Sequence, residues 1–244
     1  RKSYLYGSKN NPVENTQIIN LLKKFEDLKV LVIGDVMVDS YVWGKVSRIS
    51  PEAPVPVVMS TRTENRLGGA ANVAMNVQSL GATPVMCSVI GTDENSKIFR
   101  DLIRQLNMPE DGLIESPERI TTSKTRIIAG HQQLLRVDQE IDSYIGENLE
   151  GLLWQRIQAL VNQNNIAAII FFFYYKGVIT PRLIEKVISL GNTWKIPTLV
   201  DPKRRNFGNY REATLFKPNF KELTEGMHLE IAKSDFGNIH AAAK

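Results

Sequence analysis

The feature that most constrains this chain is an apolar segment, Val30–Ile33, which ends in Gly34-Asp35 and is followed further along by a Gly68-Gly69 pair at the start of a predicted helix. A short apolar run without alternation is typical of a strand buried on both faces of a parallel sheet. The carboxyl ends of parallel strands share one edge of a sheet, and helix N-termini there present free N–H groups. We therefore expect carboxylates and backbone amides to meet around one small polar ligand.

Strand-like and helix-like segments alternate along the rest of the chain. We predict helices over residues 68–80, 94–106, 146–164 and 181–190, and strands over residues 84–91, 166–172, 196–201 and 213–217. This alternation predicts an α/β fold with a mostly parallel sheet covered by helices on both faces. Two β-rich segments, residues 41–61 and residues 121–138, do not fit the alternation, and we expect them to form a small sheet outside the main one.

Composition narrows the class of protein. With 43% hydrophobic and 23% charged residues, the chain is typical of a folded globular protein, and no apolar run approaches the roughly 18 residues of a membrane helix. The net charge of +4 is too small and too scattered for a nucleic-acid surface, and the single cysteine cannot form an internal disulfide. We expect a cytoplasmic protein that binds small molecules and neither nucleic acid nor a membrane.

Phosphate-binding signatures of the common nucleotide folds do not occur in the sequence. Gly34 stands alone, without the Gly-x-Gly-x-x-Gly of dinucleotide-binding folds, and no Gly-x-x-x-x-Gly-Lys-Ser/Thr loop is present. Nucleotide phosphates must therefore be held in another way, if the chain binds them.

Candidate ligand-binding residues gather where the first strand ends and the Gly-Gly helix begins; they are Asp35, Asp39, Gly68, Gly69 and Asn72. An ionised carboxylate only accepts hydrogen bonds and can take two hydroxyl donors, which orients a sugar. Two simpler explanations stay open: Asp35 could cap a turn, and the double glycine could merely permit a tight turn and close helix packing.

Basic residues spaced by two occur in the second β-rich segment, where Lys124 and Arg126 would share one strand face and Arg136 would share another with Asp138. Arginine binds phosphate through two parallel hydrogen bonds, so this arrangement suits a sugar phosphate. A solvated strand face with weak ion pairs explains the same spacing equally well.

A third group of polar residues lies in the last part of the chain. Lys203 follows a strand that ends in Asp201-Pro202, so it can reach a transferred phosphate at the carboxyl edge of the sheet. Asn219 and Glu222 stand three apart at the start of a predicted short helix and would point the same way. A helix cap would account for this last pair equally well.

Taken in order, these motifs resemble the ribokinase-like (PfkB) carbohydrate kinases. The resemblance rests on Gly34-Asp35 with Asp39, Gly68-Gly69-Ala-Ala-Asn72, Asp201-Pro202-Lys203 and Lys217-Pro218-Asn219-Phe-Lys-Glu222. Three further strings are similar to the heptose-7-phosphate kinase domain of lipopolysaccharide-core biosynthesis: Arg48-Ile-Ser-Pro-Glu-Ala-Pro-Val-Pro56, Lys124-Thr-Arg126 and Gln133-Leu-Leu-Arg136-Val-Asp138. The resemblance extends from about residue 28 to the end of the chain.

The resemblance implies a ribokinase-like α/β fold with a small β lid, and transfer of the ATP γ-phosphoryl group to the anomeric hydroxyl of D-glycero-D-manno-heptose 7-phosphate with Mg²⁺. It assigns to the substrate Asp35, Asp39, Gly68, Gly69, Asn72, Lys124, Arg126, Arg136 and Asp138. It assigns Lys203, Asn219 and Glu222 to ATP, and the last two also to the metal through water. The exposed edges of the hairpin over residues 41–61, with Val55, Val57 and Val58, also lead us to expect a homodimer formed through the lid.

Two features depart from the family pattern. The family's catalytic Asp and anion-binding amides come from a Gly-Ala-Gly-Asp motif, which does not occur in these 244 residues, so we expect the catalytic Asp and the C-terminal part of the kinase domain to lie beyond Lys244. Phe173 stands where relatives carry an acidic residue ahead of Tyr-x-Lys-Gly. Two alternatives therefore stay open, another sugar kinase of the ribokinase or fructokinase type and a chain that binds sugar phosphate without turning it over.

Overall fold

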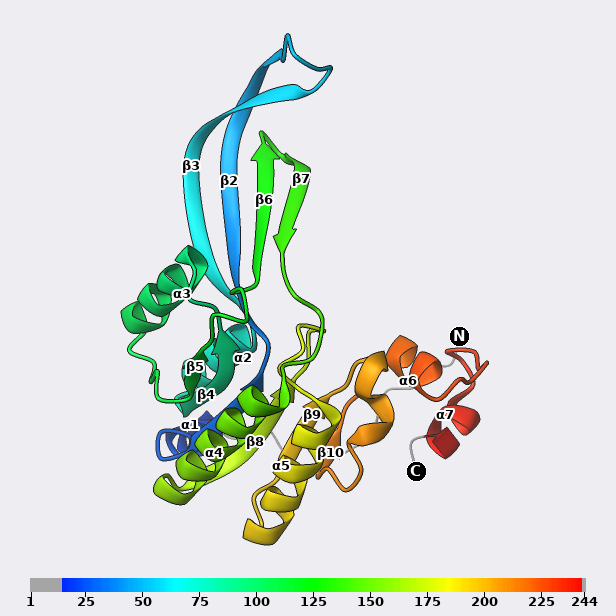
Figure 1. Ribbon diagram of the computed structural model, residues 1–244. Coiled ribbons are helices and arrows are strands. Elements are labelled where there is room, and N and C mark those ends of the chain that lie inside the picture. The colour runs from blue at the N-terminus through cyan, green and yellow to red at the C-terminus, as the bar shows by residue number, and fades with distance from the viewer. Residues whose placement is uncertain (1–14, 243–244) are drawn as a thin grey trace.

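The computed structural model describes residues 15–242, which form two sheets (Figure 1). The main sheet has six parallel strands in the order β10-β9-β8-β1-β4-β5. These strands are β1 (Lys29–Gly34), β4 (Thr83–Ile90), β5 (Leu113–Glu115), β8 (Ile166–Phe172), β9 (Thr198–Asp201) and β10 (Leu215–Phe216). The predicted ribokinase-like α/β architecture is confirmed.

Helices cover both faces of the main sheet. On one face α2 (Ala70–Ser79) and α3 (Glu94–Gln105) pack against Val30 and Val32 of β1, and on the other α4 (Glu147–Gln163) and α5 (Pro181–Trp194) pack against Leu31 and Ile33. Both sets of side chains are buried, which explains why β1 shows an unbroken apolar run. The other helices are α1 (Asn15–Lys23), η1 (Arg204–Asn209), α6 (Phe220–Gly226) and α7 (Phe236–Ala242). Within residues 15–242, no helix has the length and apolar character needed to cross a membrane.

The second sheet, which we call the lid, has the strand order β3-β2-β6-β7 and projects away from the main sheet (Figure 1). Its strands are β2 (Val36–Ile49), β3 (Pro56–Gly69), β6 (Ser123–Ala129) and β7 (Gln132–Gln139). The first hairpin is longer than the predicted 41–61, because its register continues from Ile49↔Pro56 down to Val36↔Gly69. Only Asp35 separates β1 from β2, so the lid grows directly out of the central strand of the main sheet.

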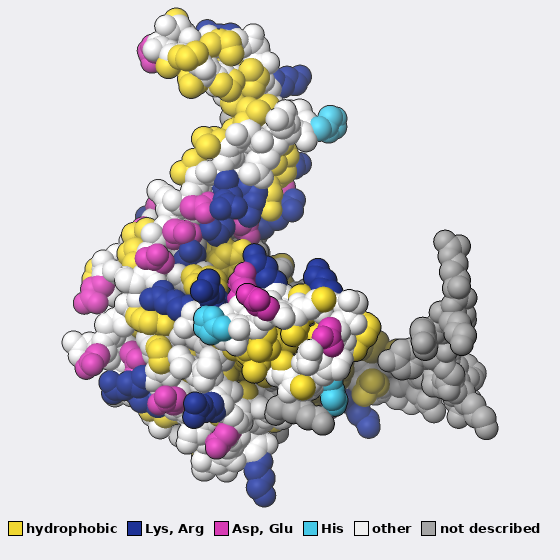
Figure 2. All heavy atoms as spheres, turned by 90° about the vertical axis from the view of Figure 1, so that its right-hand side faces the viewer, with side chains coloured by type: hydrophobic (Ala, Val, Ile, Leu, Met, Phe, Trp, Pro, Cys, Tyr) yellow, Lys and Arg dark blue, Asp and Glu magenta, His cyan; other side chains and the backbone are white. Residues whose placement is uncertain are grey.

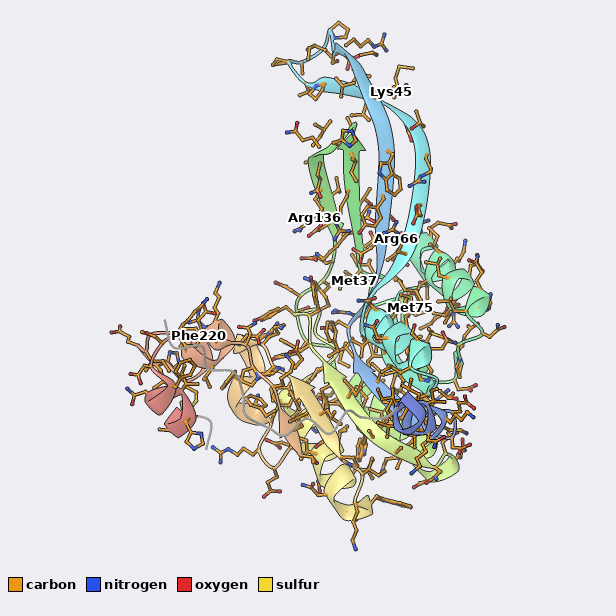
Figure 3. All side chains as sticks on the ribbon, turned by 180° about the vertical axis from the view of Figure 1, so that it is seen from behind. Met37, Lys45, Arg66, Met75, Arg136 and Phe220 are labelled. Atoms are coloured by element: carbon orange, nitrogen blue, oxygen red, sulfur yellow. The ribbon has the colours of Figure 1, made fainter. Side chains whose placement is uncertain are left out.

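Charge is distributed unevenly along the lid. Basic and acidic side chains gather on its lower part, whereas hydrophobic side chains are prominent near its tip (Figure 2). Seen from behind, Arg66 and Arg136 lie on the two outer strands of that lower part, with Met37 at the junction with the main sheet (Figure 3). Phe220 lies well away from the lid (Figure 3). The polar part of the lid therefore lies next to the carboxyl edge of the main sheet.

Candidate functional site

A cavity of about 490 Å³ opens where the lid meets α2 and α3. Its polar lining includes Asp39 from β2, Arg66 from β3 and Asn72 from the first turn of α2, and its apolar lining includes Met75 and Leu102. The structure thus brings Asp39 and Asn72, two of the predicted substrate residues, to one cavity of the size of a small-molecule site.

The double glycine is required by close packing at this point. A Cβ on Gly68 would lie 2.4 Å from Oδ2 of Asp39, and a Cβ on Gly69 would lie 2.2 Å from the backbone oxygen of Asp35. Gly69 also has φ of 60°, in the region that favours glycine. The pair therefore lets the end of β3 and the start of α2 approach both aspartates.

Asp35 and Asp39 have different environments although they are four residues apart. Asp35 is fully buried, and its carboxylate accepts backbone N–H groups of Tyr174 (2.8 Å), Lys176 (3.1 Å) and Val178 (3.0 Å). Burial raises the pKa of Asp35 even though these three hydrogen bonds favour its charged form. The carboxylate thus holds the loop that follows β8, and its predicted contact with sugar stays a prediction.

Asp39 is partly exposed and faces basic side chains. Its Oδ1 accepts a hydrogen bond from Nη1 of Arg126 at 2.6 Å, and Arg66 is its cross-strand neighbour on β3. The guanidinium carbons of Arg66 and Arg126 lie 4.8 Å and 5.2 Å from the centroid of the Tyr41 ring, within cation–π distance. Asp39 therefore presents a carboxylate held by Arg126 at the edge of the cavity, with Arg66 beside it on the neighbouring strand.

The other predicted lid residues lie on the same face as Asp39, because the registers pair Asp39 with Lys124, Lys124 with Asp138, and Arg126 with Arg136. They form two neighbouring ion-paired groups, Asp39 with Arg126 and Lys124 with Arg136, Asp138, Glu140 and Lys176. We call these seven residues together the lid cluster. It contains four basic and three acidic groups, so the cluster has one excess positive charge.

The ion pairs of the lid cluster shift its titration. Burial would lower the pKa of Lys124, but hydrogen bonds to Asp138 (2.7 Å) and Glu140 (2.9 Å) raise it. Burial would likewise raise the pKa of Glu140, but hydrogen bonds from Lys176 and Lys124 lower it below its usual value. The hydrogen bond from Lys124 lowers the pKa of Asp138. All three groups are therefore charged at neutral pH.

A second cluster, the Lys203 corner, surrounds the end of β9 and the start of α6; we define it as Asp201, Lys203, Lys217, Asn219 and Glu222. The Lys203 ammonium lies 3.2 Å from Asp201 and also pairs with Glu222. Asn219 and Glu222 form a capping box on α6: each side chain accepts the other residue's backbone N–H, at 2.9 and 2.8 Å. The structure thus shows the helix-cap role, and the predicted ATP and metal roles stay predictions.

The Lys203 corner has the donor chemistry that Mg²⁺ prefers, since Asp201 and Glu222 supply carboxylate oxygens. Among residues 15–242, no group of three or more His, Cys, Asp or Glu side chains could enclose a metal. Two carboxylates without a full protein cage fit Mg²⁺, which keeps several waters and binds through substrate phosphates. The corner therefore fits a metal held mainly by water and nucleotide.

Phe173, which stands in place of an acidic residue, does not line the site. Phe171 of β8 and Phe173, which follows the end of that strand, are fully buried in the core under α4 and α5. The next residues, Tyr174 and Tyr175, are partly exposed, and Tyr175 adopts φ of 64° and accepts a hydrogen bond from the backbone N–H of Arg204 (3.1 Å). Phe173 thus replaces the carboxylate found in relatives, while Asp35 still holds the loop that follows.

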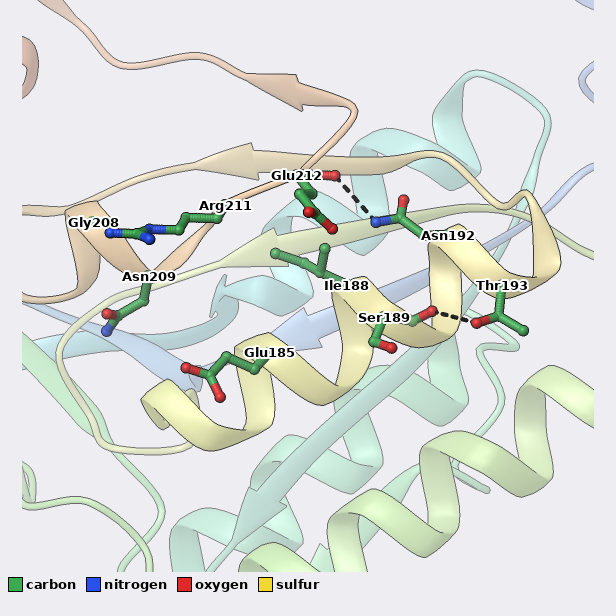
Figure 4. A pocket seen from close by; sticks show the side chains of 9 residues that line it. All are labelled: Glu185, Ile188, Ser189, Asn192, Thr193, Gly208, Asn209, Arg211 and Glu212. Atoms are coloured by element: carbon green, nitrogen blue, oxygen red, sulfur yellow. Dashed lines mark hydrogen bonds between the residues drawn. The ribbon is translucent and has the colours of Figure 1, made fainter.

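Another cavity of about 520 Å³ lies between α5 and the segment that joins η1 to β10 (Figure 4). Its lining includes Glu185, Asn192 and Glu212, and Asn192 donates to the backbone oxygen of Glu212 at 3.5 Å. None of the predicted site residues lines this cavity. Its lining brings no two basic side chains together, which sets it apart from the lid cluster.

Sequence reasoning missed two members of the lid cluster, Glu140 and Lys176. Glu140 follows Arg136 and Asp138 in steps of two, so strand alternation could have placed it on the same face. Lys176 lies in the loop after β8, and only the tertiary structure brings it to Glu140, at 2.8 Å. Arg119, in the segment that leads into β6, was missed as well. It donates to the backbone oxygen of Ile141 (3.1 Å), in the segment that follows β7, and to that of Lys176, in the loop after β8.

Comparison with known proteins agrees with this geometry. The family model described as "pfkB family carbohydrate kinase" matches residues 27–244. The chain is 42% identical over 230 residues to the Bifunctional protein HldE of Geotalea uraniireducens, covering 94% of this chain and 46% of the relative. It therefore spans about half the length of the curated relatives that it matches.

Solved structures share the fold at low sequence identity. Phosphofructokinase-2 from Escherichia coli in complex with fructose-6-phosphate has a TM-score of 0.67 at 17% identity, over 88% of this chain and 68% of that one. The tetrameric inhibited form of the same enzyme has a TM-score of 0.64 at 18% identity, with the same coverage. Because the family model covers almost the whole sequence, the chain belongs to the pfkB family of carbohydrate kinases.

Proposed function

We propose that this chain is the kinase part of a protein that transfers the ATP γ-phosphoryl group to the anomeric hydroxyl of D-glycero-D-manno-heptose 7-phosphate. The observation that carries the proposal is the position of the lid cluster beside the Asp39 cavity. A sugar phosphate needs both a carboxylate for its hydroxyls and several cations for its phosphate. Residues 48–56, 124–126 and 133–138 resemble heptose-7-phosphate kinases, which supports a heptose phosphate over hexose or pentose phosphates.

Within this proposal, Asp39 and Asn72 orient the sugar, and Gly68 leaves room for it beside the Asp39 carboxylate. Lys124, Arg126 and Arg136 bind the 7-phosphate, and Asp138 orients Lys124 and Arg136 through hydrogen bonds of 2.7 to 3.1 Å. Asp35 contributes by fixing the 174–178 loop beside the cluster. These residues bind and orient the acceptor, which places its hydroxyl towards the nucleotide.

The Lys203 corner is the proposed nucleotide side. Lys203 would pair with ATP phosphate oxygens, while Asn219 and Glu222, with Asp201 as a further carboxylate, would hold Mg²⁺ through water. Bound Mg²⁺ neutralises the charge that develops on the phosphates. At present each charge of the corner is paired with another, so nucleotide binding would require Lys203 to exchange a carboxylate for a phosphate.

Calorimetric titration with heptose 7-phosphate and with unphosphorylated heptose, set beside an assay of ADP release, tests the function. The proposal expects binding of the phosphorylated sugar by this chain and its phosphorylation by the full-length protein. A preference of the full-length protein for ribose or fructose 6-phosphate would favour another sugar kinase. Binding without any turnover by the full-length protein would favour the sugar-binding alternative.

We also propose that the lid mediates a homodimer. Leu135 and Val137 of β7 are 54% and 45% exposed on the face opposite Arg136, and Ile49, Val55 and Met59 are exposed near the tip. Apolar faces and open strand edges on a projecting sheet favour pairing with a second copy. Sedimentation velocity should show a dimer for the unmodified protein and a monomer for Leu135→Glu. An unchanged sedimentation coefficient in that variant would exclude this face.

A further inference from the structure

Two lysine ammonium groups meet at a single carboxylate in the lid cluster. Nζ of Lys124 lies 2.9 Å from Oε2 of Glu140, and Nζ of Lys176 lies 2.8 Å from Oε1. The Glu140 carboxylate thus bridges the lid strand β6 to the loop that follows β8. Ligand carboxylates and phosphates bind between paired cations in the same way.

The two lysines are buried, whereas the carboxylate between them is not. The side chains of Lys124 and Lys176 are only 7% and 11% exposed, against 29% for Glu140. A buried ammonium without a partner is costly. Lys124 also pairs with Asp138, but within residues 15–242 the ion-pair partner of Lys176 is Glu140 alone. Glu140 therefore supplies the ion-pair partner that both ammonium groups share, and it lies on their solvent side.

Glu140 can leave this position without breaking a strand ladder. It follows the end of β7, and residues 140–146 between β7 and α4 contain no helix or strand. Rotation of its side chain would open the two ammonium groups to solvent and to a ligand. The lysines, in contrast, are fixed: Lys124 belongs to β6, and the backbone of Lys176 is bound to Asp35.

We propose that Lys124 and Lys176 form an anion-binding subsite for a phosphate group, and that Glu140 fills this subsite until the ligand displaces its carboxylate. A phosphate monoester carries about −1.5 to −2 charges near pH 7 and three acceptor oxygens, whereas Glu140 carries a single negative charge. The exchange therefore favours dianionic phosphates and discriminates against monoanionic carboxylates. The inference rests on the proposed function only in taking the ligand to be a sugar phosphate.

The test uses inorganic phosphate as the probe and Glu140→Gln as the variant. Removing the internal competitor should tighten phosphate binding about tenfold in calorimetric titrations, the effect of roughly one ion pair with a buried lysine. Adding Lys176→Met to Glu140→Gln should abolish the gain. Glu115→Gln is the matched control, because Glu115 pairs with Arg100 at 2.9 Å outside the lid cluster and should leave phosphate affinity unchanged.

Thermal unfolding shows whether the Glu140→Gln variant is folded. If Glu140→Gln lowers the melting temperature, added phosphate should raise it more than in the unmodified chain, because ligand binding stabilises the folded state by mass action. Equal or weaker phosphate binding by the folded variant would overturn the inference. Failure of the full-length protein to phosphorylate heptose 7-phosphate would instead overturn the proposed function and leave the phosphate result standing.

Discussion

The lid cluster and the Lys203 corner both place a lysine between two carboxylates, yet they are built differently. Lys124 lies between Asp138, its cross-strand neighbour on β7, and Glu140, which follows the end of β7, and it is 7% exposed. Lys203 lies between Asp201 and Glu222, which come from a strand end and a helix cap, and it is 24% exposed. The lid cluster carries an excess positive charge, whereas Lys203 and Lys217 balance the two carboxylates of the corner. The excess positive charge of the lid cluster favours an anion, while the balanced corner suits a metal–nucleotide pair that brings both charges.

The largest expected effect is on the rate of phosphoryl transfer, which needs both the lid cluster and the Lys203 corner. We expect residues 1–244 to bind sugar phosphate but to release ADP at no enzymatic rate, because the Gly-Ala-Gly-Asp motif is absent from them. Loss of a general base costs about 10²–10⁴-fold, and loss of preorganised anion-stabilising donors costs a similar factor. The measurement is ADP release with heptose 7-phosphate, Mg²⁺ and ATP, with the full-length protein as control. Robust turnover by residues 1–244 would mean that the general base lies within these residues.

Asp35→Asn should affect stability more than any change in either cluster. An amide nitrogen in place of one carboxylate oxygen would face backbone N–H donors and leave at least one of them unsatisfied. We expect the free energy of unfolding to fall by about 2–4 kcal/mol, measured by urea denaturation. Leu152→Ala is a suitable surface control, since Leu152 of α4 is exposed and belongs neither to the lid nor to the Lys203 corner. Normal stability with weakened sugar binding would assign Asp35 to the substrate.

Asp39→Asn should weaken binding of the sugar phosphate and leave binding of ATP unchanged. Loss of hydrogen bonds to a charged acceptor costs about 1.5–3 kcal/mol, so the Kd for heptose 7-phosphate should rise about 10–100-fold in calorimetric titrations. The Kd for ATP should not change, because the ion-pair partner of Asp39 is Arg126 in the lid. Lys203→Met should give the opposite pattern. Parallel losses of both ligands in either variant would contradict the separation of the two regions.

Arg136→Lys should have a smaller effect that depends on the phosphate. Arg136 holds Asp138 through two hydrogen bonds of 2.9 and 3.1 Å, a geometry that lysine cannot reproduce. We expect the full-length enzyme to show a KM for heptose 7-phosphate raised about 3–10-fold, with little change for unphosphorylated heptose. Equal changes for the two sugars would remove Arg136 from the phosphate site.

The smallest expected effect is on the pH dependence of the free energy of unfolding. The pKa values of Asp138, Glu140 and Asp201 are lowered in the folded protein, so their ion pairs stabilise it fully above the ordinary carboxylate pKa and lose that contribution as the pH falls through the lowered values. Glu140→Gln should flatten the fall in unfolding free energy between about pH 5 and 3 by roughly 1 kcal/mol at most, since the pair is partly exposed. Urea denaturation across this range is the measurement. A steeper pH dependence in the variant would contradict the ion-pair assignment.

Much of the fold and part of the site could be predicted because they depend on local patterns. The apolar run of β1, the alternation of helices and strands and the two-residue spacing in β6 and β7 each fix a face or an element. Contacts between distant segments could not be predicted in this way. The role of Asp35 depends on amides about 140 residues away, and Lys176 reaches Glu140 only through the loop that those amides form.

The burial of Phe173, in contrast, follows a local pattern. Phe173 continues the side-chain alternation of β8 one residue beyond its end at Phe172, and it lies in the core with Phe171. Tyr174 and Tyr175, which follow it, are partly exposed and lie near polar groups instead. The centroid of the Tyr174 ring lies 6.0 Å from Nζ of Lys124. A run of similar residues at the end of a strand thus divides between two environments.

The single-residue junction between β1 and β2 has a mechanical consequence. The residue at this junction, Asp35, also binds the 174–178 loop through its side chain. A change of the backbone at Asp35 would therefore be transmitted directly to the loop that carries Lys176, without a relay of packed side chains.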